Sequence, residues 1–287
     1  MRKLSRKVLS LIIIINFLGM MFEISAGRYD SRTIVTNVLE QRDRLQVIRE
    51  KGVITVASPQ SDVSYFYINP NTKKIEGTEA DIITEIASRI GINKIETKNS
   101  EFANLLESLN TDDSIDIASG GIFITPEREK IVAFTQPIYK ATEAVVVPTF
   151  SNINFKSDLK NAVVGVEKGT VYESMGERWK NDKIIKDIAI FQNSTELLDA
   201  IYKRKIDAGL VDSVIVKYSL LKNKNIPLRI LKDYTPELSE NIAIAVRKND
   251  TMLLNALNEK IREIKADGTL YAILVENGLD KSNMISN

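Results

Sequence analysis

Two residues of opposite charge follow predicted strands and are the best candidates for chemistry in this sequence. Arg128 follows the stretch 118–127, in which Gly120 and Gly121 would let a ligand approach the backbone closely. A threonine–proline pair just before it is a typical helix start, so this segment leads from a strand into a helix, where ligands gather in open α/β sheets. The planar guanidinium can hold a carboxylate through two hydrogen bonds, whereas a lysine cannot. The alternative is that Arg128 is a solvated helix residue behind a good cap.

Asp212 is the anionic candidate. It ends the apolar strand predicted at 206–211, and its carboxylate can either accept an ammonium group in a cleft or cap the helix that follows. A glycine turn at 164–170 ends another predicted strand and opens the helix expected at 171–179. Free N–H groups at such a helix start bind anions. Since turns of this kind occur in many folds, this one alone is a weak signal of an anion site.

The composition excludes several classes of chemistry. The 287 residues contain no cysteine and no histidine, which rules out thiol nucleophiles, disulfides, Cys/His zinc sites and imidazole bases. Lys plus Arg number 39 against 38 for Asp plus Glu, without blocks of one sign, so the basic surface of a nucleic-acid-binding protein is not expected. We therefore expect no metal, no cofactor and no nucleic-acid partner.

The amino terminus has the pattern of an export signal. Basic residues at positions 2, 3, 6 and 7 precede the apolar run 8–22, and small residues lead from there to Ala26. The run is shorter than the roughly 20 apolar residues of a membrane-spanning helix, so a cleaved signal peptide over 1–26 is favoured over a retained anchor. We expect an exported protein, in the periplasm or at the extracytoplasmic face of the cell membrane.

Beyond this signal, predicted strands and helices alternate along the chain. A lead-in at 27–50, with a charged helix around 34–48, is expected to pack loosely on the rest. The elements that follow are a strand at 53–57, helices at 80–90 and 102–109, strands at 115–118 and 163–166, a helix at 195–203 and the strand at 206–211. This alternation is typical of parallel α/β sheets. The segments 104–118 and 196–208 are similar, which indicates two lobes of like construction, although any helix-to-strand crossover shares part of the pattern.

Two extended segments, 144–148 and 242–246, lie between the predicted halves, and a helix with an apolar stripe follows the second at 252–265. Two crossings would form a hinge, because the backbone change on closure can be confined to a few residues. We therefore expect residues 51–143 and 240–287 in the first lobe and 144–239 in the second.

Taken together, these segments resemble the extracellular solute-binding protein family 3, the amino-acid-binding components of bacterial ABC transporters. The resemblance covers nearly the whole mature chain, from 52–56 through 124–128 and 134–139 to 266–270, and the string Ile-Thr-Pro-Glu-Arg at 124–128 is a specific match. It implies an α/β type II periplasmic-binding fold, with two lobes joined by two extended hinge crossings. It also implies a non-enzymatic binding protein whose partner is an ABC permease, and we expect a monomer.

The resemblance also implies roles for individual residues. Arg128 would bind the α-carboxylate of the ligand with help from the backbone N–H groups of Gly121 and Thr170, and Asp212 would bind its ammonium group. Tyr65 and Phe102 would form walls of the side-chain pocket.

This sequence departs from the family pattern where specificity lies. Phe123 stands where the family often has Ser or Thr, and Gly77-Thr78-Glu79 replaces the common Gly-Phe-Asp. A more aromatic pocket would stack on a flat or cationic side chain, with Glu79 or Asp62 as the counter-charge. The alternative is that Phe123 points into the core. We expect the ligand to be a polar or cationic amino acid or a related zwitterion, cyclic and methylated compatible solutes included.

Two other functions stay open at this stage. Some proteins with this fold are lyases or dehydratases, and a lone glutamate could serve such chemistry. The pair Arg128 and Asp212 has no recognisable acid–base pair beside it, so binding is the favoured function. A protein that senses its ligand and docks on a receptor would use the same closure as a transport subunit, and neighbouring genes for a permease or a kinase would separate the two.

Overall fold

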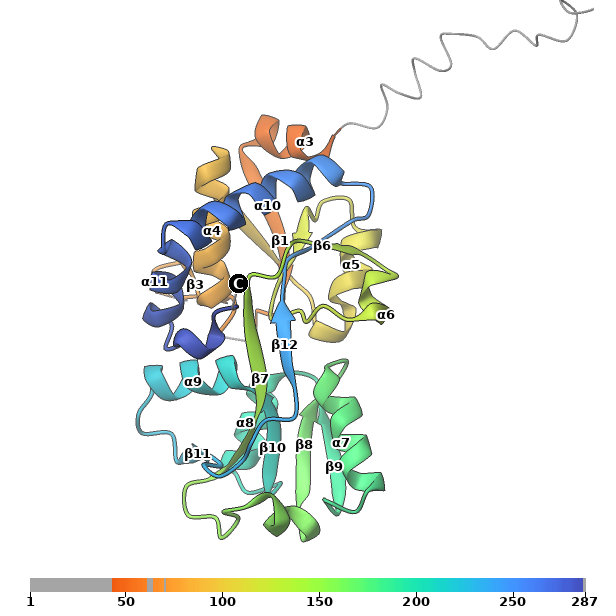
Figure 1. Cartoon of the computed structure of the whole chain (residues 1–287), viewed down its shortest axis with the longest axis vertical. Coiled ribbons are helices and arrows are strands. Elements are labelled where there is room, and N and C mark those ends of the chain that lie inside the picture. Colours follow the sequence, from red (N-terminus) through yellow and green to blue (C-terminus); the bar gives the residue numbers. More distant parts are fainter. Residues whose placement is uncertain (1–42, 61–63, 70, 286–287) are drawn as a thin grey trace, which may run out of the picture. The chain divides into compact units, whose positions relative to one another are not determined.

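The computed structural model describes residues 43–60, 64–69 and 71–285 (Figure 1). The predicted signal peptide and Asp62 lie outside the described residues, as does the lead-in up to residue 42. None of the helices in the described ranges is both long and apolar enough to cross a membrane.

The first lobe is built on a five-stranded sheet in the order β4-β1-β5-β13-β6. Its strands are β1 (Val53–Ser58), β4 (Lys94–Asn99), β5 (Ile117–Ala118), β6 (Ala133–Phe134) and β13 (Ala245–Val246). Strand β1 pairs in parallel with β4 and β5, whereas β13 runs antiparallel to β5 and β6. A separate hairpin joins β2 (Tyr67–Ile68) to β3 (Ile75–Glu76).

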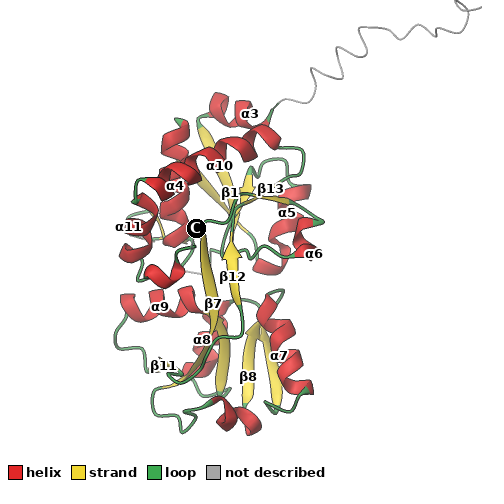
Figure 2. Cartoon of the chain, viewed as in Figure 1, coloured by secondary structure: helices red, strands yellow, loops and turns green. Residues whose placement is uncertain are grey.

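Helices pack around this sheet (Figure 2). They are α3 (Arg44–Lys51), α4 (Thr78–Ile90), α5 (Leu105–Thr111), α6 (Pro126–Glu129), α10 (Thr251–Ala266) and α11 (Thr269–Glu276), with 3-10 turns η1 (Phe102–Asn104) and η3 (Lys281–Asn283). The apolar stripe predicted for 80–90 is buried in α4, and Gly91 ends that helix in the left-handed conformation, as the sequence predicts.

The second lobe has a six-stranded sheet in which β11, β7, β10, β8 and β9 are successive neighbours and β12 also pairs with β7. Its elements are β7 (Tyr139–Pro148), η2 (Lys156–Asn161), β8 (Val163–Glu167), α7 (Val171–Asn181), β9 (Asp187–Phe191), α8 (Ser194–Tyr202), β10 (Ala208–Asp212), α9 (Ser213–Lys222), β11 (Leu228–Ile230) and β12 (Ser239–Ile242). Strands β8, β9 and β10 are parallel, and β7 is antiparallel to β10.

The two crossings between the lobes are the long strand β7 and the strand β12, which run side by side as an antiparallel pair (Figure 1). The predicted crossing at 144–148 is the carboxyl-terminal half of β7, which pairs with β10 and β11 inside the second lobe, whereas residues 139–142 of β7 pair with β12. The single strand predicted at 242–246 is wrong, because the chain there forms two strands. Strand β12 ends at Ile242 and pairs with β7, and after two residues β13 joins the sheet of the first lobe.

Helix α3 is anchored to the first lobe, so the expected loose packing of the lead-in is wrong for its residues 44–50. Leu45 and Ile48 are buried, and the Nε atom of Arg44 lies 2.8 Å from a carboxylate oxygen of Asp116. Asp116 has no exposed side-chain surface and also accepts a hydrogen bond from the Thr55 backbone N–H at 2.8 Å. The positive charge of Arg44 offsets the cost of burying this carboxylate, which ties the helix to strand β1.

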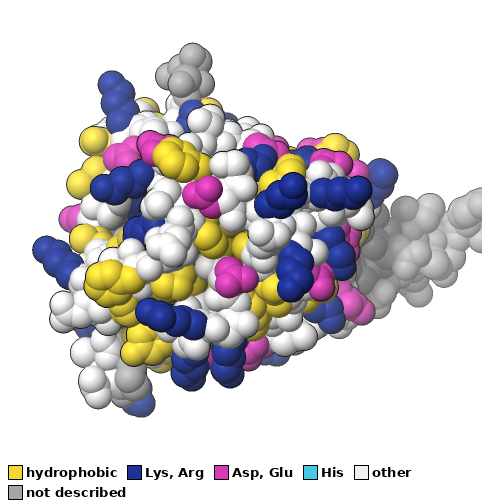
Figure 3. Space-filling model, turned by 90° about the horizontal axis from the view of Figure 1, so that it is seen from below, with side chains coloured by type: hydrophobic (Ala, Val, Ile, Leu, Met, Phe, Trp, Pro, Cys, Tyr) yellow, Lys and Arg dark blue, Asp and Glu magenta, His cyan; other side chains and the backbone are white. Residues whose placement is uncertain are grey.

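The end of the second lobe seen in Figure 3 shows basic, acidic and apolar side chains interspersed. This face therefore carries no single-sign field, in keeping with the formal net charge of +1 for the whole sequence.

Candidate functional site

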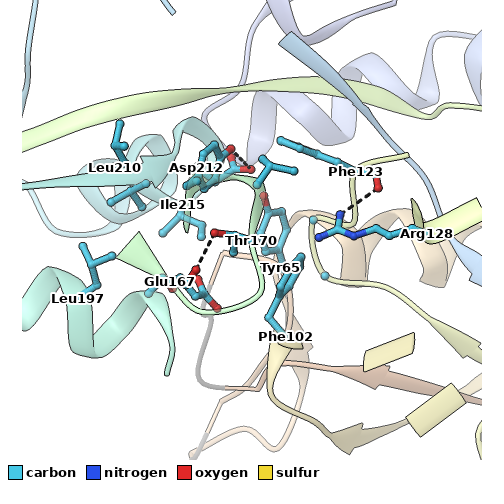
Figure 4. A pocket seen from close by; sticks show the side chains of 16 residues that line it. Tyr65, Phe102, Phe123, Arg128, Glu167, Thr170, Leu197, Leu210, Asp212 and Ile215 are labelled. Carbon is cyan, nitrogen blue, oxygen red and sulfur yellow. Dashed lines mark hydrogen bonds between the residues drawn. The ribbon is translucent and has the colours of Figure 1, made fainter. Parts of the chain in front are cut away.

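A pocket lies between the two lobes, at the edges where the parallel strands end (Figure 4). The cavity in it is small, about 30 Å³, because the lining side chains of the two lobes lie close together. The first lobe contributes Tyr65, Phe102, Gly120, Gly121, Phe123 and Arg128, and the second contributes Glu167, Thr170, Val171, Tyr172, Ser194, Leu197, Leu210, Val211, Asp212 and Ile215. All of the predicted site residues except Glu79 are among them.

Arg128 enters the pocket from the short helix α6. Thr125 caps this helix by accepting a hydrogen bond from the Arg128 backbone N–H at 3.3 Å, as the sequence predicts. The guanidinium donates to the carbonyl oxygen of Phe123 at 3.0 Å and, across the cleft, to that of Gly169 at 3.3 Å. It lies 5.2 Å from the ring centre of Phe102. Burial lowers the pKa of Arg128 from its ordinary value, but an arginine stays charged in proteins.

Asp212 does two things in this structure. One carboxylate oxygen caps helix α9 by accepting a hydrogen bond from the Val214 backbone N–H at 2.7 Å, and the other accepts one from the Tyr172 hydroxyl at 3.2 Å. Burial raises the pKa of Tyr172 well above its ordinary value, so this hydroxyl stays protonated and donates. The capping role is therefore present, and the same carboxylate also lines the pocket.

The ring of Tyr65 leaves no room for a side chain at position 121, which only glycine can therefore occupy. The φ of Gly121 is +73°, and a Cβ atom there would lie 2.6 Å from two carbons of that ring. The backbone N–H of Gly121 donates to the Glu79 carboxylate at 2.9 Å. Its predicted contact with a ligand carboxylate is therefore not supported, because this donor already satisfies a buried acceptor.

Glu79 lies behind the pocket wall and not in it. Its side chain is 1% exposed and accepts hydrogen bonds from the Ser119 hydroxyl, the Gly121 N–H and, at 2.9 Å, the Tyr139 hydroxyl. Burial raises the pKa of Glu79, while these hydrogen bonds lower it by a smaller amount. The predicted role as a counter-charge in the pocket is wrong for this residue. Glu79 instead links helix α4, the loop 119–121 and the start of crossing β7.

The aromatic residues lie where the sequence predicts a wall. Tyr65, Phe102 and Phe123 all line the pocket. Phe123 is 2% exposed and meets Tyr172 of the other lobe edge to face, with ring centres 6.0 Å apart and planes at 83°. The ring of Phe123 thus faces the cleft and contacts the opposite lobe.

Thr170 takes part in its own turn. Its hydroxyl donates to the carbonyl oxygen of Glu167 at 2.7 Å, and its backbone N–H makes a longer bond of 3.4 Å to the same atom. The neighbouring Gly169 faces the first lobe, because a Cβ atom at this glycine would lie 2.8 Å from the Cα atom of Ala103. This contact and the bond from Arg128 close the lobes over the pocket.

Among the lining residues with ionisable side chains, the sequence analysis missed Glu167 and Tyr172. Glu167 is the last residue of β8. A charged residue at the end of a predicted strand, just before a glycine turn, could have indicated that its side chain lines the pocket. Tyr172 lies in the first turn of α7, and the local sequence gives no sign that it reaches Asp212. Within the described ranges, three or more acidic residues do not cluster in a way that could hold a metal ion.

The geometry suits a small zwitterion. One cation enters the pocket from the first lobe and carboxylates enter it from the second, while aromatic and aliphatic side chains cover the space between them. A ligand with a carboxylate and an ammonium group would be held by opposite lobes.

Comparisons with known proteins agree with this geometry. The model for bacterial extracellular solute-binding proteins, family 3, matches residues 54–277. A probable histidine-binding protein of Neisseria gonorrhoeae is 29% identical over 198 residues, which make up 68% of this chain and 71% of that relative. The solved structure of an ancestral arginine-binding protein bound to arginine has a TM-score of 0.69 and 28% identity, over 78% of this chain and 97% of that structure.

One similar protein is an enzyme. The membrane-bound lytic murein transglycosylase F of Desulfosudis oleivorans is 29% identical over 238 residues, which make up 79% of this chain and 48% of the enzyme. The chain thus spans about half the length of that relative.

Proposed function

We propose, since this chain belongs to the bacterial extracellular solute-binding proteins, family 3, that it is the exported subunit of an ABC uptake system and captures an amino acid between its two lobes. The observation that carries this proposal is the arrival of Arg128 and Asp212 in one pocket from opposite lobes. Either residue alone could be structural, but a guanidinium and a carboxylate across a shared cavity match the two charged groups of an amino acid.

In this proposal Arg128 holds the α-carboxylate and Asp212 the ammonium group. Each protein group is oriented from within its own lobe. The guanidinium donates to the carbonyl oxygen of Phe123, and the carboxylate accepts from the Val214 N–H and the Tyr172 hydroxyl. A fixed site loses less conformational entropy on binding, which favours affinity.

The crossings β7 and β12 serve as the hinge. Closure is favoured only by as much as the ligand binds the closed form better than the open one. Since the pocket takes its lining from both lobes, a ligand in it contacts both lobes only when they are closed.

The ligand proposed is a polar or cationic amino acid. Relatives are described as binding histidine and arginine, and the rings of Tyr65, Phe102 and Phe123 offer faces on which a flat or cationic group can stack. We propose that the amino-terminal segment 1–26 directs export to the extracytoplasmic side of the membrane, where a monomer delivers its ligand to an ABC permease.

We propose binding without turnover. The lytic transglycosylase is about twice as long as the stretch it shares with this chain, and the lining carboxylate of Asp212 is engaged as a helix cap and as an acceptor from Tyr172. An enzyme would convert the captured compound, so recovery of an unchanged ligand after prolonged incubation separates the two functions.

The test begins with native mass spectrometry of the freshly purified protein, to identify any ligand that travels with it. A calorimetric screen of the common amino acids then compares wild type, Arg128→Ala and Arg128→Lys. Removing one partner of a buried charge pair costs about 2 to 5 kcal/mol, so both variants should lose at least about tenfold in affinity.

The matched control is Arg49→Ala, which removes an arginine from the exposed face of α3. It should bind like wild type. Wild-type protein that binds no amino acid, or an Arg128→Ala variant that binds as tightly as the control, would refute the proposal.

A further inference from the structure

A second cavity lies in the first lobe, and it shares no described lining residue with the pocket around Arg128. Its volume is about 350 Å³, which is large enough for a small molecule. The described residues that line it include Gln136, Ile138, Arg262, Lys265, Met284 and Ile285, and none of them is acidic. The cavity therefore combines two cations with apolar side chains.

Helix α10 carries both cations on the face that it turns toward the segment 136–138. Asn258, Arg262 and Lys265 follow one another at helical spacing, so they lie on one side of this helix. Gln136 fixes the segment on that side. Its backbone N–H donates to the side-chain oxygen of Asn258 at 2.6 Å, and its side-chain N–H donates to the carbonyl oxygen of the same residue at 2.6 Å. Both cations are thus placed at the cavity by a regular helix that is bonded to the opposing segment.

Neither cation has an acidic partner in the part of the chain that the structure describes. The Lys265 ammonium is partly buried and donates to a backbone carbonyl oxygen, and burial lowers the pKa of Lys265. Arg262 is exposed. The acidic side chains closest to it along the helix, Glu259 and Glu263, pair with Lys260 instead. A partly buried charge is stabilised by a partner of opposite sign, and an anion in the cavity would supply one.

Three apolar side chains share the cavity with these cations. Ile138 is 1% exposed, and Met284 and Ile285 line the cavity with it. A methionine side chain is flexible and adapts to ligands of different shape. An inorganic anion would leave this apolar surface in contact with water, whereas an anion with a hydrocarbon body would cover it.

We propose that this cavity binds a small organic anion, namely a carboxylate with a short aliphatic body. The planar guanidinium of Arg262 can hold a carboxylate through two hydrogen bonds. The ammonium group of Lys265 has three donors, of which one is used by the backbone. The aliphatic body packs on Ile138 and Met284. This second site does not depend on the function proposed for the pocket around Arg128.

Hexanoate and hexanamide are the matched probes, because they have the same chain length and only hexanoate is charged. Isotope-labelled methionine methyl groups report binding by NMR, and the signal of Met284 is assigned by its loss in Met284→Leu. Titration with hexanoate should shift this signal until it saturates. The signal of Met252, at the amino-terminal end of α10, should not shift. Hexanamide should bind at least about tenfold more weakly than hexanoate.

The double variant Arg262→Gln/Lys265→Gln removes both charges and should bind hexanoate at least about tenfold more weakly than wild type. Lys260→Gln is the matched control, since it removes a lysine of the same helix whose ammonium group is already paired with two carboxylates. Its hexanoate affinity should stay within about twofold of wild type, because salt screens charges that do not touch the ligand. A cooperative thermal transition in each variant shows that it is folded.

The proposal fails if the Met284 signal of wild type shows no saturable shift with hexanoate. Equal affinities for hexanoate and hexanamide would also overturn it, because the cavity would then be an apolar patch without a role for its cations. A folded double variant that binds hexanoate as tightly as wild type would place the anion elsewhere.

Discussion

Gly169 is a residue at which lobe closure can be perturbed without changing any side chain that lines the pocket. Its φ is +76°, and a Cβ atom added there would lie 2.8 Å from both the Cα and the Cβ atoms of Ala103 in the other lobe. The substitution Gly169→Ala therefore pushes a methyl group against the backbone of the first lobe. It also disturbs the 3.3 Å bond that Arg128 donates to the Gly169 carbonyl oxygen.

Two energetic costs of Gly169→Ala can be separated. The left-handed backbone costs an alanine roughly 1 to 2 kcal/mol, and this cost applies to the open and the closed form alike, so it lowers stability but not affinity. The clash with Ala103 exists only when the lobes are closed. Overpacking of this kind typically costs about 1 to 3 kcal/mol, which corresponds to a loss of about 5- to 140-fold in ligand affinity.

A matched control is available at Gly91, which ends helix α4. Its φ is +88°, and a Cβ atom there would meet nothing within 4 Å. Gly91→Ala should lower the melting temperature through the same backbone strain and leave the affinity unchanged. Calorimetry with the amino acid that binds wild type most tightly gives the affinities, and thermal unfolding gives the stabilities.

Small-angle scattering adds a direct measure of closure. Saturating ligand should reduce the radius of gyration of wild type and Gly91→Ala, and the closed form of Gly169→Ala should be reached only at higher ligand concentration. The reasoning is refuted if both alanine variants bind as tightly as wild type, because the Gly169–Ala103 contact would then play no part in the ligand-bound form.

Three further predictions concern single side chains. Asp212→Asn should keep the melting temperature, since asparagine caps helices as well as aspartate, and lose at least about tenfold in amino-acid affinity; unchanged affinity would leave Asp212 as a cap alone. Phe123→Ser should weaken a cationic ligand by about 2- to 30-fold in calorimetry and widen tolerance for small polar amino acids, while a drop in stability with an unchanged ligand ranking would place Phe123 in the core only. Burial raises the pKa of Glu79 above 4.5, so the folded form binds this proton more tightly and wild-type stability falls as the pH rises above 4.5 through the raised pKa. The melting temperature of Glu79→Gln, relative to wild type, should therefore rise over that range, and a difference that does not change with pH would contradict a raised pKa of Glu79.

The elements that carry a regular apolar pattern could be predicted from the sequence. The helix expected at 80–90 is α4, and the one expected at 252–265 is α10 within one residue at each end. In both, the buried residues repeat every three or four positions, so the local sequence contains the periodicity that tertiary packing selects. The division of 242–246 between the two strands β12 and β13 was missed. A continuous apolar run does not show where one strand ends at the hinge and the next joins the sheet of the first lobe.

The hydrogen bonds behind the pocket could not be predicted, because each joins residues far apart in the chain. Glu79 meets Gly121 and Tyr139 only after α4, the glycine loop and β7 have packed together. From sequence alone, a glutamate near an expected pocket fits a counter-charge for the ligand as well as it fits a buried hydrogen-bond acceptor. The structure decides between the two because only a fully buried carboxylate must collect donors from the surrounding backbone.

The contacts between the lobes and the charges in the pocket oppose each other when no ligand is bound. Closure brings Arg128 to Gly169 and Phe123 to Tyr172, which favours the closed form. The same motion removes water from the carboxylate of Asp212, and taking a charged group out of water is costly. The ammonium group of a ligand offsets this cost, and its carboxylate adds a partner for Arg128. We therefore expect closure to depend on the ligand, so that Asp212→Asn lets the empty protein close more readily, as small-angle scattering without ligand should show.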